Sequence, residues 1–290
     1  MKKTLVITDS ASTVPLEVAK KLSIKILPFK VDLNGRTFLT SDYTNEEIYK
    51  ILDEATSLPV TSQITPIEFE EVYLEAFNKG YDAVFLILIN SEGSGTFNNS
   101  ILAKTLFFDD YPKAKGKFEI YSFDGASYTG AYGQIVIDVA EMLKQGTSIE
   151  ECAKYAEEHL KRRRIYFGIY SLKYAARSGR IPSAAAFVGD ALGLKPVMKI
   201  FDHNITTAKK VHGEKKIISV ILSLVKAEMI PNSKYSVVYG SDHKLKDTMI
   251  EKATEFIGYP PINSYQIDTA IAINAGPKII GLIFDTKDVN

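Results

Sequence analysis

A short polar loop between two patterned segments is the part of this sequence best suited to bind a ligand. Residues 90–98, Asn-Ser-Glu-Gly-Ser-Gly-Thr-Phe-Asn, directly follow the apolar run 83–89 and precede a stretch with helical patterning. The N-terminus of a helix offers unpaired N–H groups and a partial positive charge, which together favour an anion. Ser94 and Thr96 would add hydroxyl donors, and Gly95 would let the chain turn between them.

The residues alone leave two interpretations of this loop open. Either the loop holds an anion, or Ser94 only caps the helix while Gly93 and Gly95 only form the turn. The loop is not a nucleotide-binding fingerprint, because it lacks the third glycine of G-x-G-x-x-G. No G-x-x-x-x-G-K-[ST] motif occurs anywhere in the sequence.

Other polar segments could contribute to the same site. Thr61-Ser62-Gln63 precedes a helix start, and residues 9–13 end the first expected strand. In open α/β sheets ligands bind beyond the carboxyl ends of the strands, so hydroxyl-bearing segments at several strand ends support one another. The turn at residues 177–182 carries Arg177 and Arg180, and a guanidinium can grip a carboxylate or phosphate with two hydrogen bonds. The alternative for this turn is a pair of surface arginines in salt bridges.

No arrangement of residues indicates catalysis or metal binding. The four histidines show no H-E-x-x-H or other close ligand spacing. Cys152 is the only cysteine, which excludes an internal disulfide and a cysteine-based metal cluster. No G-x-S-x-G elbow supports a hydrolase. We therefore expect anion-binding loops without a catalytic residue, a metal or a cofactor.

The composition indicates a globular protein that does not attract polyanions. The chain has 290 residues, 46% of them hydrophobic and 24% charged, enough for two domains with normal cores. Thirty-five basic and thirty-five acidic residues balance, which disfavours nucleic acid, and we expect Lys161–Arg164 to be a solvated helix end. The apolar stretch near the N-terminus is too short for a signal peptide, and no run approaches the roughly 20 apolar residues of a membrane span. We expect a cytoplasmic protein.

Patterns in the first half predict an α/β domain with a mostly parallel sheet. Short β-branched runs alternate with helical patterns, which favours strands joined by crossover helices. The run 83–89 is apolar on both faces, as in a central parallel strand. Capping boxes predict helix starts after Thr44, Thr65 and Ser148. The expected strands cover residues 5–8, 25–33, 83–89 and 118–123.

The second half predicts an α+β domain with a mixed or antiparallel sheet. Helical patterns at 214–229 and 244–257 would pack on one face of that sheet. Asp202-His203-Asn204 fits a hairpin turn, since Asn and Asp tolerate positive φ. We place the division after the basic helix end, giving an N-terminal α/β domain at 1–163 and a C-terminal α+β domain at 164–290. The expected strands cover residues 165–170, 196–201, 205–211, 235–239 and 270–284.

Six short motifs occur in the order and spacing of one known family. They are Asp9-Ser10-Ala11-Ser12, Thr61-Ser62-Gln63, Ser91-x-x-Ser94-Gly95-Thr96, Gly179-Arg180-Ile181, Gly193-Leu194-Lys195-Pro196 and Gly276-Pro277. Together they resemble the DegV family almost from end to end. The resemblance implies a two-domain fold that holds one long-chain fatty acid in a buried tunnel, with the carboxylate met by the hydroxyls of Thr61 and Ser94. In many bacteria such proteins are acyl-binding subunits of a fatty acid kinase, and Arg180 would then orient the carboxylate or meet the ATP-binding partner.

The sequence departs from the family pattern at three places. Asn274 and Ala275 stand where the family usually has His-Thr before Gly-Pro, so a head-group histidine is replaced. His212 stands where the family has an arginine, and Gly125 follows Asp124 in place of a serine. These departures indicate a divergent member in which lipid binding is retained.

Three hypotheses about function follow. The first is non-catalytic binding of a long-chain fatty acid of about C14–C18, its length read by buried apolar area, with a fatty acid kinase subunit as partner. The second is an enzyme that acts on a small phosphorylated or carboxylated metabolite at the Gly93–Thr96 loop. The third is a regulatory protein that interacts through the surface at residues 177–181. Under the first hypothesis, the ligand contacts are Thr61, Ser62, Ser94, Gly95, Thr96, Arg180, His212 and Asn274.

Overall fold

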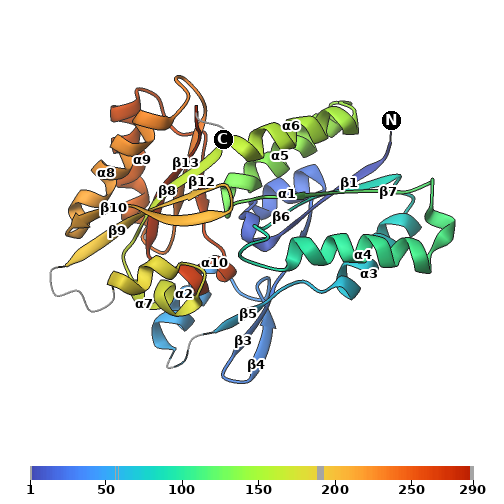
Figure 1. The fold of residues 1–290 in the computed structure, drawn as a ribbon, viewed down its shortest axis with the longest axis horizontal. Coiled ribbons are helices and arrows are strands. Elements are labelled where there is room, and N and C mark those ends of the chain that lie inside the picture. Colours follow the sequence, from blue (N-terminus) through green and yellow to red (C-terminus); the bar gives the residue numbers. More distant parts are fainter. Residues whose placement is uncertain (1, 56, 58, 188–192, 288–290) are drawn as a thin grey trace.

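The computed structural model describes residues 2–55, 57, 59–187 and 193–287, which form three β-sheets (Figure 1). The first sheet consists of β1 (Thr4–Asp9), β2 (Lys25–Leu27), β6 (Ala83–Leu88) and β7 (Glu119–Asp124). Its strands are parallel and follow the order β2-β1-β6-β7. Every residue of β6 is buried, because helices cover both faces of the sheet. The expected central parallel strand is therefore confirmed.

Helices pack on both faces of the first sheet. They are α1 (Leu16–Leu22), α3 (Pro66–Asn78), α4 (Thr96–Asp110), α5 (Gly130–Lys144) and α6 (Ile149–Arg162). α3 and α4 lie together on one face, and α1, α5 and α6 lie on the other (Figure 1). The capping boxes expected at Thr65 and Ser148 begin α3 and α6, and the box at Thr44 begins α2 (Asn45–Glu54). Among the described helices, none is long and apolar enough to cross a membrane.

A small antiparallel sheet extends from the first half and carries one of the expected ligand segments. It consists of β3 (Lys30–Leu33), β4 (Arg36–Leu39) and β5 (Val60–Ser62), in the order β4-β3-β5. The sequence predicted a single strand at 25–33, and that prediction is wrong because the chain leaves the first sheet at Pro28. Proline has no N–H to donate to a ladder, so β2 ends before it and β3 joins a different sheet.

The second sheet has six strands, and all but one of its neighbouring strand pairs are antiparallel. They are β8 (Arg163–Ile169), β9 (Leu194–Phe201), β10 (Asn204–His212), β11 (Tyr235–Tyr239), β12 (Asn263–Gln266) and β13 (Ile279–Asp285). Their order is β10-β9-β8-β13-β11-β12, and β11 pairs with β12 in parallel. α8 (Ile217–Glu228) and α9 (His243–Ile257) cover one face, as the helical patterns predicted. The mixed sheet of the second half is confirmed.

The turn between β9 and β10 also forms as predicted. Asp202 and His203 have φ values of 46° and 66°, which is the left-handed conformation that a two-residue hairpin turn requires. Short 3-10 helices lie elsewhere at η1 (Ser10–Ser12), η2 (Pro112–Ala114), η3 (Pro182–Phe187) and η4 (Glu214–Lys216).

The predicted strand at 270–284 is only partly correct. Its first part is a helix, α10 (Thr269–Ala275), and β13 begins only at Ile279. Asp268 caps α10 by accepting a 2.9 Å hydrogen bond from Ile271 N, and Gly276 ends it. A buried apolar run has the same composition in a helix as in a strand, so pattern alone did not separate the two.

The basic cluster at residues 161–164 is only in part the solvated helix end that the sequence predicted, because Lys161 is exposed on the last turn of α6 while the last two arginines are buried. Arg163 and Arg164 are 6% and 4% exposed and begin β8. Nε of Arg163 lies 3.1 Å from Oδ1 of Asp285, and Arg164 pairs with Glu228. Both partners follow more than 60 residues later in the chain. The chain passes from α6 to β8 of the second sheet here, and the division after residue 163 stays a prediction.

Candidate functional site

The loop after β6 has two glycines that neighbouring side chains approach closely. A Cβ atom on Gly93 would lie 2.2 Å from the hydroxyl of Tyr128, and one on Gly95 would lie 2.1 Å from Oε1 of Gln63. Real Cβ atoms do not approach other atoms so closely, so these neighbours would have to move. The two glycines therefore allow Tyr128 and Gln63 to pack directly on the loop.

Ser94 bonds to the first residue of α4 and also lines a cavity, so both interpretations of this loop stay open. Its Oγ accepts a 3.3 Å hydrogen bond from Thr96 N and lies 2.9 Å from Thr96 Oγ1, so it satisfies part of the first turn of α4. Ser94 also lines a cavity between the first and second sheets. The loop before α4 thus brings the hydroxyl of Ser94 to the cavity wall.

The cavity has a volume of about 550 Å³, within the range of small-molecule pockets. Much of its wall is aliphatic and comes from the second sheet, which contributes Ile165, Phe167, Ile200, Ile205, Val238 and Ile279. Phe29, Ile89 and the α10 residues Ala270, Ile271 and Ala275 add further apolar surface. Such a wall can bury a long hydrocarbon chain but offers nothing to a charged group.

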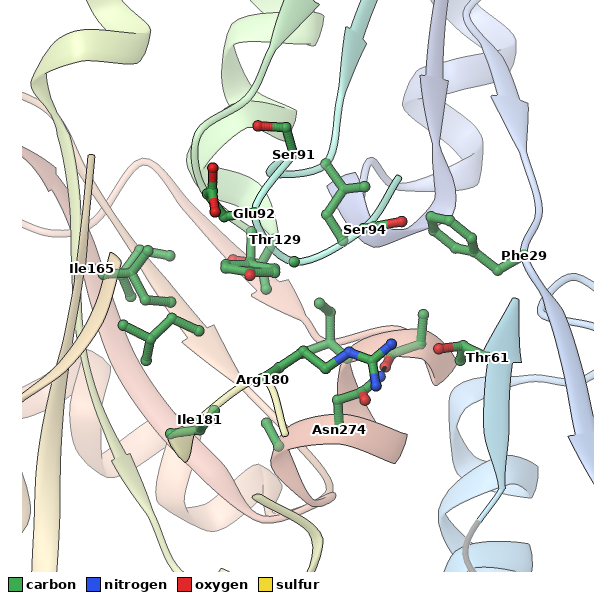
Figure 2. Close-up of a pocket in the computed structure, with 18 of the residues that line it drawn as sticks. Phe29, Thr61, Ser91, Glu92, Ser94, Thr129, Ile165, Arg180, Ile181 and Asn274 are labelled. Carbon is green, nitrogen blue, oxygen red and sulfur yellow. Dashed lines mark hydrogen bonds between the residues drawn. The ribbon is translucent and has the colours of Figure 1, made fainter. Parts of the chain in front are cut away.

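Polar side chains converge on the cavity from separate elements (Figure 2). Thr61 comes from β5, Ser94 from the loop before α4, and Asn274 from α10. Arg180 follows α7 (Leu172–Ser178), and in Figure 2 its guanidinium points toward Asn274 and Thr61. Hydroxyl, amide and guanidinium donors therefore face one part of the cavity, while Ser91, Glu92 and Thr129 line another part.

The guanidinium of Arg180 is available to an anion. Its Nη1 donates a 2.8 Å hydrogen bond to the carbonyl of Ser178, and it forms no ion pair with any of the described residues. Asn274 is partly engaged, because its Nδ2 donates to the carbonyl of Ala270 at 2.8 Å. The positive charge at this site therefore comes from Arg180, while Asn274 is neutral.

The structure brings together six of the eight residues expected to contact a ligand. Thr61, Ser62, Ser94, Gly95, Arg180 and Asn274 line the cavity. Thr96 does not line it, since its buried hydroxyl is bonded to Ser94 and accepts from Ile64 N at 3.3 Å. His212 does not line it either, because it lies exposed at the far end of β10, opposite Leu194.

Sequence reasoning missed two lining residues that follow β7. Tyr128 and Thr129 lie in the loop before α5, and both contribute to the cavity wall. Thr129 is 4% exposed and has a φ of 59°, which is rare for a β-branched residue. The sequence did contain a signal for these two residues, because their loop also follows the carboxyl end of a parallel strand, where ligands bind.

Asp9 does not line the cavity, but it is hydrogen-bonded to Ile89, which does. Its carboxylate accepts hydrogen bonds from Ala11 N, Ile89 N and the hydroxyl of Tyr132, at 3.1, 2.7 and 2.6 Å. Burial raises the pKa of Asp9 to about 7, even though these bonds lower it. Burial likewise raises the pKa of Asp268, whose carboxylate accepts from Ser10 Oγ at 2.9 Å.

Comparison with known proteins identifies the family. A model of the DegV family matches residues 3–287. The chain belongs to the DegV family. Among curated relatives, a DegV domain-containing protein of Caldanaerobacter subterraneus is 29% identical over 99% of this chain and 100% of its own length.

Solved DegV structures share the fold along their whole length. A stearic acid-binding protein from Eubacterium ventriosum is 26% identical, with a TM-score of 0.86 over 99% of both chains. The fatty acid binding protein DegV of Bacillus subtilis is 27% identical, with a TM-score of 0.82 over 99% of this chain and 100% of its own. The DegV fold of the chain, with one parallel and one mixed sheet, is therefore confirmed.

Proposed function

We propose that this protein binds one long-chain fatty acid in the cavity, with the hydrocarbon chain along the second sheet and the carboxylate among Thr61, Ser94 and Arg180. The observation that carries the proposal is a largely aliphatic cavity with hydrogen-bond donors gathered on one part of its wall. The DegV relatives described as fatty acid binding support it.

The energetics of such a ligand favour this arrangement. Burying about fifteen methylene groups at about 0.8 kcal/mol each gives an upper bound near 12 kcal/mol before ordering costs. Burying the carboxylate without hydrogen bonds would cancel much of that gain, so its binding site needs hydrogen-bond donors. The hydroxyls of Thr61 and Ser94 and the guanidinium of Arg180 supply them. We expect chains of about C14–C18 to bind, because length is measured by buried apolar surface.

We further propose that the bound fatty acid is presented to an ATP-dependent fatty acid kinase subunit. Phosphorylation of a carboxylate needs its oxygen to be reachable, and Arg180 is exposed as well as lining the cavity. The protein itself would do no bond chemistry. The hydroxyl of Ser94 is bonded to Thr96 rather than to a general base, so the alternative of an enzyme at this loop gains no support.

Native mass spectrometry of the purified protein tests lipid binding directly. We expect a mass increase that corresponds to one fatty acid, and uptake of added palmitate or oleate after the protein has been delipidated. A protein that carries no lipid and takes up none would refute the proposal. The kinase role has a separate test, in which a purified ATP-binding kinase subunit should release ADP only in the presence of the loaded protein.

A further inference from the structure

The tip of the β9–β10 hairpin, formed by Asp202 and His203, leaves the second sheet and contacts the first half of the chain (Figure 1). His203 N donates a hydrogen bond to the carbonyl of Ala126 at 3.1 Å, and Asn90 Nδ2 donates to the carbonyl of His203 at 2.8 Å. Nδ1 of His203 lies 2.8 Å from Asn90 Oδ1 and 3.7 Å from Asp124 Oδ2. The hairpin tip is thus tied to the loops that follow β6 and β7.

Asn90 determines how the imidazole is bonded. Its buried amide oxygen accepts from Glu92 N at 3.2 Å, and its nitrogen donates to the hydroxyl of Tyr128 at 3.1 Å as well as to the hairpin tip. Because a carbonyl oxygen can only accept, Nδ1 of His203 must carry the hydrogen that joins the two side chains. We call the pair of Asn90 and His203 the latch.

Residues joined to the latch form part of the cavity wall. Asn90 begins the loop whose residues 91–95 line the cavity, and Tyr128, which Asn90 holds, lines it as well. Ile205, two residues beyond the hairpin tip, lines both the cavity and a neighbouring hollow of about 400 Å³. That hollow is bounded by His203 and by the exposed Asn204. Glu92, Gly93, Tyr128 and Arg180 also line both spaces, so the cavity and the surface hollow adjoin at these residues and at Ile205, next to the hairpin tip.

Polar contacts hold the hairpin tip, and Ile205 beyond it is only partly buried against the core. Asp202, Asn204 and Thr206 are exposed, and β10 is an edge strand that pairs only with β9 among the described strands. The register shifts between Thr207 and Lys209, which interrupts the ladder just beyond this segment. The bonds between Asn90 and His203 are partly buried, and water can replace them when the tip moves away, so this segment opens more readily than one inside the core.

We propose that the hairpin tip is the gate through which the acyl ligand enters and leaves the cavity, and that the latch keeps this gate shut. The proposal rests on the proposed function for the identity of the ligand. Opening would displace the wall at Ile205 and leave Thr61 and Ser94 in place, because these lie on elements of the first half. Weakening such a gate should raise the rate constants of ligand uptake and release by the same factor. Their ratio, the Kd, should therefore stay unchanged.

His203→Gly tests the latch while keeping the turn. It removes the imidazole, and glycine suits the φ of 66° at this position. Asp202→Gly is the matched control, since it changes the same turn at a φ of 46°. The side chain of Asp202 is exposed and makes no hydrogen bond or ion pair within the described part of the chain. His203→Ala also removes the latch without adding glycine, and it should behave like His203→Gly.

Stopped-flow fluorescence with cis-parinaric acid, a fluorescent long-chain fatty acid, measures uptake and release on the full-length protein. We expect His203→Gly to raise both rate constants at least about fivefold, the effect of losing roughly one hydrogen bond, with Kd nearly unchanged. Asp202→Gly should match the wild type. Unchanged rates in both His203 variants, or faster release without faster uptake, would overturn the gate. If the wild-type protein takes up no fatty acid, the proposed function fails, and the gate for that ligand fails with it.

Discussion

The hydroxyl of Tyr132 donates a 2.6 Å hydrogen bond to Oδ1 of Asp9, at the carboxyl end of β1. The other carboxylate oxygen of Asp9 accepts from the backbone of Ile89, which lines the cavity. Burial raises the pKa of this carboxyl to about 7. A buried acid with a pKa near neutrality therefore lies directly behind the ligand cavity.

The raised pKa of Asp9 predicts a pH-dependent stability. Between about pH 4 and pH 7 the folded state keeps a proton that the unfolded state has lost, so the contribution of this group falls as pH rises. We expect the free energy of unfolding of the wild type to drop relative to Asp9→Asn by about 2 kcal/mol from about pH 5 to pH 7.5. Urea titrations of both proteins at several pH values measure this. Parallel pH profiles would contradict the raised pKa.

Removing the hydroxyls at the polar part of the cavity should weaken lipid binding. Ser94→Ala and Thr61→Val each leave the buried carboxylate with one donor fewer, at a cost of about 1–3 kcal/mol in binding free energy. Equilibrium displacement of a fluorescent fatty acid measures the change. His212→Ala serves as the control, because His212 lies outside the cavity wall. Wild-type affinity in Ser94→Ala would remove Ser94 from the head-group site.

The charge of Arg180 should matter only for a ligand that carries a charge. Arg180→Gln is expected to weaken fatty acid binding by about 1 kcal/mol, since an exposed guanidinium is partly screened by water. Binding of the fatty alcohol of equal length should not change. Arg177→Gln is the matched control, an exposed arginine on the last turn of α7 that does not line the cavity. Equal losses for acid and alcohol would show that Arg180 acts by packing alone.

The buried ion pair of Arg163 and Asp285 predicts a large stability effect at residues that do not line the cavity. Burial raises the pKa of Asp285, but the bond from His159 and the charge of Arg163 lower it more, so the net shift is downward. The contribution of the pair is therefore present above about pH 4 and lost as pH falls through the folded pKa. At neutral pH, Asp285→Asn leaves Arg163 buried and unpaired and should cost about 3 kcal/mol.

A surface pair provides the comparison for that measurement. Asp109 and Lys115 lie 3.4 Å apart with both side chains more than half exposed, so Asp109→Asn should cost less than about 1 kcal/mol. Chemical denaturation of the two variants and the wild type at neutral pH gives both values. Similar losses of unfolding free energy in the two variants would mean that water solvates the pair of Arg163 and Asp285 in the folded protein.

Features set by neighbouring residues could be predicted from the sequence. The capping boxes at Thr44, Thr65 and Ser148 formed because both partners of each lie within one turn of helix. The hairpin turn at Asp202 depends on local φ preferences. The loop at Ser94 was found for a similar reason, since strand ends are visible in the pattern and ligands gather beyond them.

Features set by distant residues could not be predicted. Arg163 is buried because Asp285, far away in sequence, supplies its counter-charge. The residues of the cavity wall, such as Phe167 and Val238, could not be predicted from the sequence for a different reason. An apolar residue beside a cavity and one in a packed core have the same pattern, and only the arrangement of the sheets distinguishes them. The helix at Thr269–Ala275 was hidden by the same ambiguity.

The small sheet that carries Thr61 makes the proposed ligand site depend on three separate parts of the chain. The three head-group residues come from three parts of the chain: Thr61 from the small sheet, Ser94 from the first half and Arg180 from the second half. A carboxylate that contacts all three would therefore connect these parts. Lipid that binds only the folded protein adds about 2.7 kcal/mol to the free energy of unfolding at a hundredfold excess over Kd. Unfolding that separates these parts would therefore have to release the lipid as well.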